Sequence, residues 1–300
     1  MSKQRPLIFG EVLFDVFEDG GAVLGGAPFN VAWHLHGFGA NPLFVSRVGD
    51  DDLGRQVIDA MQKWGMDCSA LQTDPVHATG QVKVELEQGQ PTYTIEQDVA
   101  YDHIDVDLLI PQLINSPPSL TYHGSLITRE HDSRAGLIYL RSRLDSPVFI
   151  DINLRAPWHS REQAEALVED ATWLKLNDEE LEIFAGRTLN GLDEARQAAQ
   201  DLMLLYGLNA IIVTLGHEGA FVLSDAGSYL TPPAPAEDLI DTVGAGDALS
   251  SVILFGLAKD WPLQLALQRA VEFASAICEQ KGATSFDKDL YNRFLEKWKT

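Results

Sequence analysis

Apolar positions follow two different spacings along the chain, and the two spacings alternate. Short continuous apolar runs are typical of buried strands, whereas apolar residues three or four positions apart are typical of helices. The predicted strands are residues 7–14, 42–48, 120–122, 148–150, 173–176 and 210–215. The predicted helices are residues 30–37, 53–64, 133–144, 192–206, 249–258 and 263–280. Strands that alternate with helices in this way predict an α/β fold, a mostly parallel sheet with helices on both faces.

Residues 81–87 and 92–97 depart from this pattern, because apolar and polar residues alternate one by one across the turn from Gln88 to Pro91. That alternation predicts a β-hairpin. Its apolar face would stay half covered unless it closes over a ligand or pairs with a second subunit, so we expect a homodimer through this face. We interpret about 12–25 and 78–102 as a lid on a single domain that spans residues 1–300. A surface hairpin with no role in binding fits the pattern equally well.

The composition is that of a globular protein and argues against several partners. With 300 residues, 45% of them hydrophobic, the chain can bury an α/β core without disulfides. The net charge of −22 argues against nucleic acids and anionic membranes as partners, because both require clustered Lys and Arg. No apolar stretch is long enough to cross a bilayer, and Cys68 and Cys278 lie far apart, so we expect a cytoplasmic protein. An anionic ligand would then need backbone amides and a divalent cation, for which we infer Mg²⁺.

A glycine-rich turn precedes the predicted helix at residue 249, and it carries an acid. Gly244 and Gly246 lack Cβ atoms, so the backbone can aim several N–H groups at one phosphate. Asp247 would lie within reach of a hydroxyl that approaches this phosphate, where a carboxylate can orient the hydroxyl and accept its proton. An N-capping Asp after a glycine turn is the simpler interpretation of the same residues.

A second glycine-rich turn, at Gly25 and Gly26, precedes the first predicted helix. The side-chain amide of Asn30 can donate and accept hydrogen bonds at once, which suits a ligand with many hydroxyls. Asp15, at the end of the first predicted strand, adds an acceptor at the edge where open α/β sheets bind ligands. A tight turn with a capping Asp remains an alternative here as well.

Six segments together, in this order and spacing, resemble the PfkB (ribokinase-like) carbohydrate kinases over nearly the whole chain. They are residues 10–15, 25–32, 151–155, 177–180, 213–219 and 241–248. The first two look most like the fructokinase branch. The resemblance implies a ribokinase-like three-layer α/β/α sandwich with a mostly parallel central sheet and a small β-sheet lid. It also implies an ATP-dependent sugar kinase that phosphorylates a monosaccharide hydroxyl, with fructose as the first expected substrate.

The resemblance also implies roles for single residues. Asp247 would be the catalytic base, and Gly244, Ala245 and Gly246 would form an anion hole. The sugar would contact Asp15, Gly25, Gly26, Asn30, Ser125, Asn153 and Arg155. ATP would contact Asn177, Glu180, Thr214, Gly216, Gly219, Gly244, Gly246 and Ser275, with Mg²⁺ held indirectly through Glu180. A monovalent cation, usually K⁺, would lie at Asp241, Val243 and Gly282.

Several of these assignments have ordinary structural alternatives. Asn177 with Glu180 is also a helix N-cap followed by acidic residues, and Gly216 with Gly219 is also a hairpin turn. Arg155 could form a surface ion pair instead of binding phosphate. The chain lacks a Gly-x-x-x-x-Gly-Lys-Ser/Thr P-loop and a His-Arg-Asp loop, which argues against the P-loop and protein-kinase routes. Two further possibilities stay open, a kinase of 2-keto-3-deoxygluconate, ribose or a nucleoside, and a non-catalytic sugar- or nucleotide-binding protein.

Overall fold

The computed structural model describes residues 5–18, 20–87, 90–107, 109–154, 161–235 and 239–299. Its largest element is a nine-stranded sheet with the order β13-β12-β11-β10-β9-β8-β1-β4-β5. The strands are β1 (Leu7–Phe9), β4 (Leu43–Gly49), β5 (Leu71–Asp74), β8 (Thr121–Gly124), β9 (Val148–Asp151), β10 (Trp173–Asn177), β11 (Ala210–Thr214), β12 (Ala220–Ser224) and β13 (Gly227–Thr231). Neighbouring strands are parallel from β5 to β11, and only β12 and β13 run antiparallel to their neighbours. The predicted mostly parallel sheet is confirmed.

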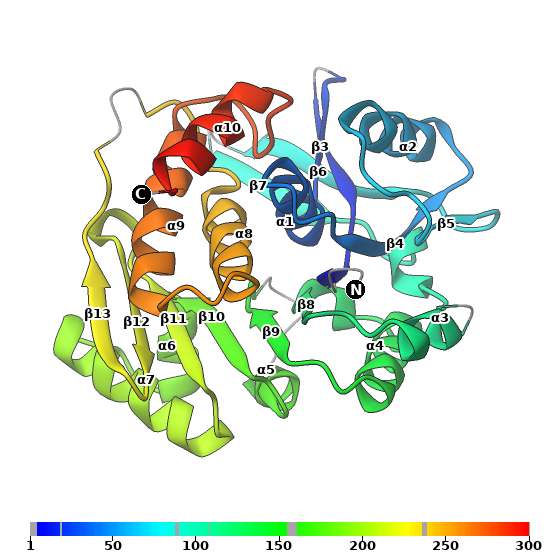
Figure 1. The fold of residues 1–300 in the computed structure, drawn as a ribbon. Coiled ribbons are helices and arrows are strands. Elements are labelled where there is room, and N and C mark those ends of the chain that lie inside the picture. Colours follow the sequence, from blue (N-terminus) through cyan, green and yellow to red (C-terminus); the bar gives the residue numbers. More distant parts are fainter. Residues whose placement is uncertain are drawn as a thin grey trace.

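Helices cover both faces of this sheet (Figure 1). One face packs against α1 (Ala27–Gly37), α2 (Asp52–Trp64), α8 (Ala245–Leu257), α9 (Leu263–Cys278) and α10 (Lys288–Lys297). The other packs against α3 (Ile110–Asn115), α4 (His131–Arg143), α5 (Arg161–Val168), α6 (Asp178–Ala185) and α7 (Leu192–Tyr206). Short 3₁₀ turns are η1 (Ala100–His103), η2 (Leu126–Thr128) and η3 (Gly216–Glu218). The result is three layers.

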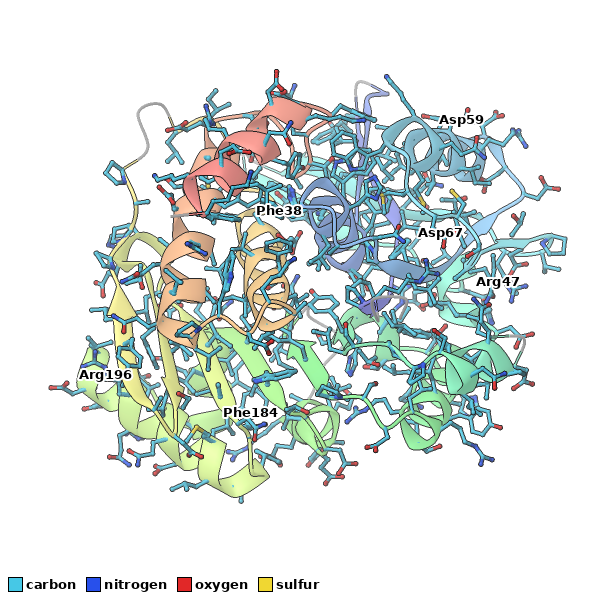
Figure 2. The ribbon with its side chains drawn as sticks, in the orientation of Figure 1. Phe38, Arg47, Asp59, Asp67, Phe184 and Arg196 are labelled. Carbon is cyan, nitrogen blue, oxygen red and sulfur yellow. The ribbon has the colours of Figure 1, made fainter. Side chains whose placement is uncertain are left out.

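Apolar side chains of each strand point alternately to the two faces of the sheet, so helices must cover both faces. In β1, Ile8 lies in the core on the α1 side, whereas its neighbours Leu7 and Phe9 lie in the core on the opposite side. Figure 2 labels one buried aromatic residue in each layer of helices, Phe38 and Phe184, which are 3% and 6% exposed. Among the described residues, no helix combines the length and the apolar character that crossing a bilayer would require.

The predicted first strand, residues 7–14, is wrong as a single element. The chain leaves the large sheet after Phe9 and enters a different sheet at Leu13. Gly10 lies at the break, packed so closely on the ring of Pro28 that a Cβ on this glycine would overlap it. Asp15 therefore lies inside β2 (Leu13–Phe17) and not at the end of the first strand.

A second, small sheet has the order β3-β2-β6-β7, with β3 (Ala22–Gly25), β6 (Gly80–Glu87) and β7 (Gln90–Ile95). The predicted hairpin is confirmed as β6 and β7, although two of its turn residues, 88 and 89, lie outside the described residues. Asp15 pairs with Val23 on one side and with Val82 on the other, so these side chains share one face. Phe17, which is 41% exposed, lies on this face too, because it is two residues from Asp15.

Candidate active site

The glycine-rich turn at residues 241–248 leads directly into α8, which begins at Ala245 and not at Leu249 as predicted. Gly244 is the N-cap residue, with a left-handed φ of 82°, and a Cβ at this position would overlap the Cβ of Ala283. Asp247 therefore lies in the first turn of the helix, so the N-capping interpretation is wrong. Gly246 and Asp247 lie in the first turn of the helix, where backbone N–H groups point out of the helix start, whereas the N–H of Ala245 donates to the carbonyl of Thr242 at 3.3 Å.

The two glycine-rich turns meet through their polar side chains. Asn30, on α1, donates from Nδ2 to Oδ2 of Asp247 over 2.7 Å, although the two residues are 217 positions apart. The side chain of Asn30 is buried, and its Oδ1 has no hydrogen-bond partner among the described residues. The amide therefore fixes the carboxylate of Asp247 and keeps one acceptor for another group.

Gly25 and Gly26 connect the small sheet to α1, the helix that carries Asn30. Gly26 has a φ of 109°, and a Cβ on it would come within 2.8 Å of the carbonyl oxygen of Glu11. A Cβ on Gly25 would lie 3.7 Å from Oδ2 of Asp15. The carbonyl of Gly26 accepts the backbone N–H of Asn30 at 2.9 Å. The residues of this segment that are predicted to bind the sugar, Asp15, Gly25, Gly26 and Asn30, are therefore neighbours, and Asn30 links them to Asp247.

Glu11 is a second carboxyl group at this place, and it is not among the site residues predicted from the sequence. It is 4% exposed, and its Oε2 has no hydrogen-bond partner among the described residues. Burial, with a further contribution from the negative charge of Asp247, raises the pKa of Glu11 to about 7. An acid inside the apolar run 7–14 was the available signal, since acids are seldom buried without a partner.

A buried polar network lies beneath the turn, centred on Asp151. Its carboxylate accepts from Lys175 Nζ at 2.8 Å, from Ser250 Oγ at 2.6 Å and from the hydroxyl of Tyr122 at 3.2 Å. Burial opposes the charge on Lys175, but attraction by Asp151 outweighs it and the pKa of Lys175 is raised. The ammonium lies against the backbone of the predicted anion hole, since a Cβ on Gly246 would be 3.1 Å from Nζ.

This network orients the start of α8. Ser250 lies one helical turn beyond Asp247, so its bond to Asp151 holds the face of the helix that carries Asp247. A lysine inside the predicted buried strand 173–176 and the acid at the start of the segment 151–155 were the signals for the network in the sequence.

Asn177 and Glu180 form a capping box at the start of α6. Asn177 Oδ1 accepts the N–H of Glu180 at 2.7 Å, and Glu180 Oε2 accepts the N–H of Asn177 at 2.8 Å. The second carboxylate oxygen accepts the N–H of Leu154 at 2.8 Å, and burial raises the pKa of Glu180. The helix N-cap that the sequence offered as an alternative is therefore present, and contact of this pair with ATP or Mg²⁺ stays a prediction.

The other residues assigned to ATP lie on neighbouring elements. Thr214 pairs with Asn177 across β10 and β11. Gly216 and Gly219, with φ values of 54° and 96°, lie in the connection from β11 to the antiparallel β12, as in the hairpin alternative. Ser275, on α9, donates from Oγ to the carbonyl of Ala234 at 3.2 Å. Contact of these residues with a nucleotide stays a prediction.

Ser125 and Asn153 lie together, after β8 and β9. Ser125 Oγ donates to the carbonyl of Asn153 at 2.7 Å and accepts the N–H of Asn153 at 3.1 Å. Both line a cavity of about 290 Å³ between α4 and α5, whose lining includes neither Asn30 nor Asp247. Arg155 lies outside the described residues.

The two loops assigned to a monovalent cation touch each other through Asp241. Its carboxylate accepts the N–H of Val243 at 3.0 Å and the N–H of Gly282 at 3.2 Å. The second loop also supplies Ala283, which packs against Gly244. The predicted loop pair exists, and a cation within it stays a prediction.

Comparison with known proteins matches residues 17–289 to the model of the pfkB family of carbohydrate kinases. Fructokinase-2 of Oryza sativa subsp. japonica is 27% identical over 303 residues, which cover 91% of this chain and 87% of that protein. A fructokinase double mutant from Vibrio cholerae O395, solved with fructose, ADP and potassium ion bound, is 25% identical, with a TM-score of 0.78. That match covers 97% of this chain and 98% of the other.

A ribokinase structure from Arabidopsis thaliana has a TM-score of 0.82 over 98% of this chain and 99% of that chain, at 19% identity. At this identity the likeness concerns the fold alone. The ribokinase-like fold expected from the sequence is confirmed.

Proposed function

Because this chain belongs to the pfkB family of carbohydrate kinases and is therefore a sugar phosphotransferase, we propose that it transfers the γ-phosphoryl group of ATP to a hydroxyl of fructose. The observation that carries the proposal is the 2.7 Å hydrogen bond between Asn30 and Asp247, which unites the sugar-binding turn with the anion-binding turn. Fructose is favoured because both the rice relative and the Vibrio cholerae structure are fructokinases, the latter with fructose and ADP bound.

Asp247 is the catalytic base of the proposed reaction. Its carboxylate accepts the proton of the sugar hydroxyl, and the hydroxyl oxygen forms a new bond to the γ-phosphorus. The bond from that phosphorus to the β,γ-bridging oxygen breaks, and ADP leaves with the electron pair. Asn30 holds the carboxylate in place, and the Oδ1 atom of Asn30 is an acceptor for a second sugar hydroxyl.

The first turn of α8 stabilises the charge on the transferred group. The N–H groups of Gly246 and Asp247 point out of the helix N-terminus, where the backbone dipoles attract an anion. Lys175 adds a positive charge directly behind Gly246, which matters in a chain of net charge −22. The energetic benefit comes from donors that are already in position before the phosphate arrives.

The residues assigned to cations fit them in different ways. Both carboxylate oxygens of Glu180 already accept backbone N–H groups, so Glu180 fits Mg²⁺ through bound water and not by direct ligation. Both oxygens of Asp241 likewise accept backbone N–H groups, from Val243 and Gly282, so backbone carbonyl oxygens of these two loops would be the direct ligands of K⁺. When bound, Mg²⁺ neutralises phosphate charge and K⁺ steadies the turn before Gly244.

The small sheet is the lid of the proposed enzyme. Asp15 lies on the same face as the apolar side chains of Phe17, Val23 and Tyr93, which are 41%, 40% and 63% exposed. Closure of this face over the sugar would exclude water from the reaction. A second copy of the chain would cover the apolar remainder, so the proposal includes a homodimer through the lid. We further propose that the enzyme acts in the cytoplasm.

An ADP-release assay over several acceptors tests the proposal. The protein is supplied with MgATP and, in turn, fructose, ribose, 2-keto-3-deoxygluconate and a nucleoside, with and without K⁺. We expect fructose to give the highest kcat/KM and K⁺ to raise it. A higher kcat/KM for another acceptor would contradict only the assignment of fructose as the substrate. If no acceptor caused release of ADP, the proposed catalysis itself would be contradicted.

A further inference from the structure

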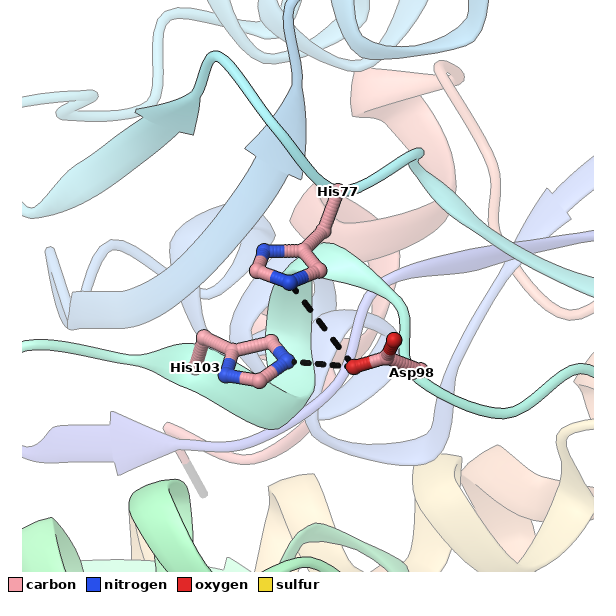
Figure 3. A group of neighbouring side chains, drawn as sticks. All are labelled: His77, Asp98 and His103. Carbon is pink, nitrogen blue, oxygen red and sulfur yellow. Dashed lines mark hydrogen bonds and ion pairs between the residues drawn. The ribbon is translucent and has the colours of Figure 1, made fainter.

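Two histidines and one aspartate converge at a place that the sugar-kinase chemistry does not use. Oδ1 of Asp98 lies 2.9 Å from Nε2 of His103 and 3.7 Å from Nε2 of His77 (Figure 3). One ligand atom from each of the three residues lies within 4.8 Å of the others. The imidazole rings are stacked, with their centroids 3.8 Å apart. Three groups that can bind a metal therefore face one small volume.

The opposite ring nitrogens are held by two further carboxylates. His77 Nδ1 lies 2.9 Å from Oδ2 of Asp74, and His103 Nδ1 lies 3.0 Å from Oδ2 of Asp132. Asp74 is buried, and it also accepts the backbone N–H of Val76 at 2.8 Å and pairs with Arg47 at 2.9 Å. Each Nδ1 donates to one of these carboxylates, so in the neutral histidine the proton lies on Nδ1 and the lone pair of Nε2 is available to a metal ion.

Three aspartates, Asp74, Asp98 and Asp132, surround the two imidazole rings, and their negative charge favours a cation where Nε2 of each histidine meets Oδ1 of Asp98. Without a metal ion, a proton on His103 takes this place, since Nε2 of His103 lies within hydrogen-bond distance of Asp98. A carboxylate that binds the far nitrogen of a metal-ligating histidine is the usual way in which proteins orient such a ligand. We propose that His77, His103 and Asp98 bind a divalent transition-metal ion of the Zn²⁺ class, oriented by Asp74 and Asp132.

The ligand types and their burial fit this class of ion. Nitrogen and carboxylate ligands suit Zn²⁺, Co²⁺ and Ni²⁺, whereas Mg²⁺ and Ca²⁺ prefer oxygen alone. The side chains of His77 and His103 are 25% and 23% exposed, so packing holds their rings. Asp98 is 77% exposed, which leaves the outer side of the site open to water as the remaining ligand.

The ion would join the two ends of the β6–β7 hairpin. His77 precedes β6, Asp98 follows β7, and His103 ends η1. The backbone already links these segments, because the N–H of Ala100 donates to the carbonyl of Ala78 at 2.8 Å. A bound ion therefore adds a cross-link at the base of the small sheet and stabilises the folded chain by mass action.

Titration of the full-length chain, without an affinity tag and without ATP, with Co²⁺ tests this site. We expect a visible ligand-field absorption that saturates at one equivalent and is abolished by Zn²⁺ in competition. His103→Gln should weaken binding at least about tenfold, and Asp132→Asn should weaken it about tenfold without removal of a ligand. His131→Gln is the matched control, because His131 is 81% exposed and also contacts Asp132. It should keep the wild-type affinity.

The melting temperature gives the second readout. Zn²⁺ should raise it for the wild-type chain and for His131→Gln, but not for His103→Gln. If His103→Gln fails to fold, Asp98→Asn replaces an exposed side chain and must show the same loss. The proposal is overturned if the wild-type chain shows no saturable binding of Co²⁺, or if Asp98→Asn and His103→Gln bind it as tightly as His131→Gln.

Discussion

Two carboxyl groups lie at the predicted active site, and their surroundings differ. Asp247 is half-buried at a helix start and is fixed by Asn30, whereas Glu11 is buried with an oxygen that has no partner among the described residues. Asp247 could be predicted from the sequence because a glycine turn before a helix is a local signal. Glu11 could not be assigned a role, because charged groups that act on it, Asp247 and Arg129, lie far from it in the chain.

Replacement of Glu11 should change how stability depends on pH. Burial raises its pKa from 4.5 to about 7, so the folded state penalises the ionised form. The free energy of unfolding of the wild type should therefore fall between pH 5 and pH 8, and this residue accounts for about 2–3 kcal/mol of that fall. Urea unfolding at both pH values should show this contribution missing in Glu11→Gln and present in the exposed control Glu18→Gln. Identical pH dependence in the two variants would show that Glu11 is not the group responsible.

Gly244→Ala should impair turnover beyond the cost of backbone strain. Gly244 and Gly39 both have left-handed φ values, 82° and 77°, but only at Gly244 would a Cβ overlap a neighbour, Ala283. Both substitutions should lower the free energy of unfolding by about 1–2 kcal/mol through strain. Only Gly244→Ala should also displace the anion hole, so its kcat should fall at least tenfold while Gly39→Ala keeps its activity. Equal activities of the two variants would argue that the turn does not position phosphate.

At the scale of elements, the periodicity of apolar residues predicted most strands and helices but not all of their ends. The run 7–14 reads as one strand because β1 and the first two residues of β2 are all buried, yet the chain changes from one sheet to the other between Phe9 and Leu13. The start of α8 was placed too late because Ala245 and Gly246 are not apolar anchors, although they are helical. Local patterns report burial, and they do not report which sheet provides it.

The exposed face of the small sheet should hold two copies of the chain together. Phe17→Glu would place a charge in that contact, so we expect a wild-type dimer and a Phe17→Glu monomer by sedimentation velocity. Leu204→Glu is the matched control, since Leu204 is a 71% exposed apolar residue on α7, outside the small sheet, and its replacement should leave the dimer intact. A monomeric wild type, or dissociation only in Leu204→Glu, would contradict a dimer through the lid.

At the scale of the whole molecule, the fold positions a site that no single segment contains. The sequence predicted the three layers and the two glycine turns that meet at Asn30 and Asp247. It could not predict the network in which Asp151 binds Ser250, because those residues are 99 positions apart and Ser250 belongs to none of the six segments. The same holds for His77 and His103, whose stacking depends on the fold around the hairpin.

The central claim, that Asp247 deprotonates the sugar hydroxyl, is tested most directly by the turnover of Asp247→Asn with MgATP and fructose. The control is Asp260→Asn, an exposed aspartate just beyond the other end of α8. We expect Asp247→Asn to lower kcat by at least about a hundredfold, with little change in sugar affinity or melting temperature, while Asp260→Asn matches the wild type. A kcat for Asp247→Asn close to that of Asp260→Asn would contradict the account.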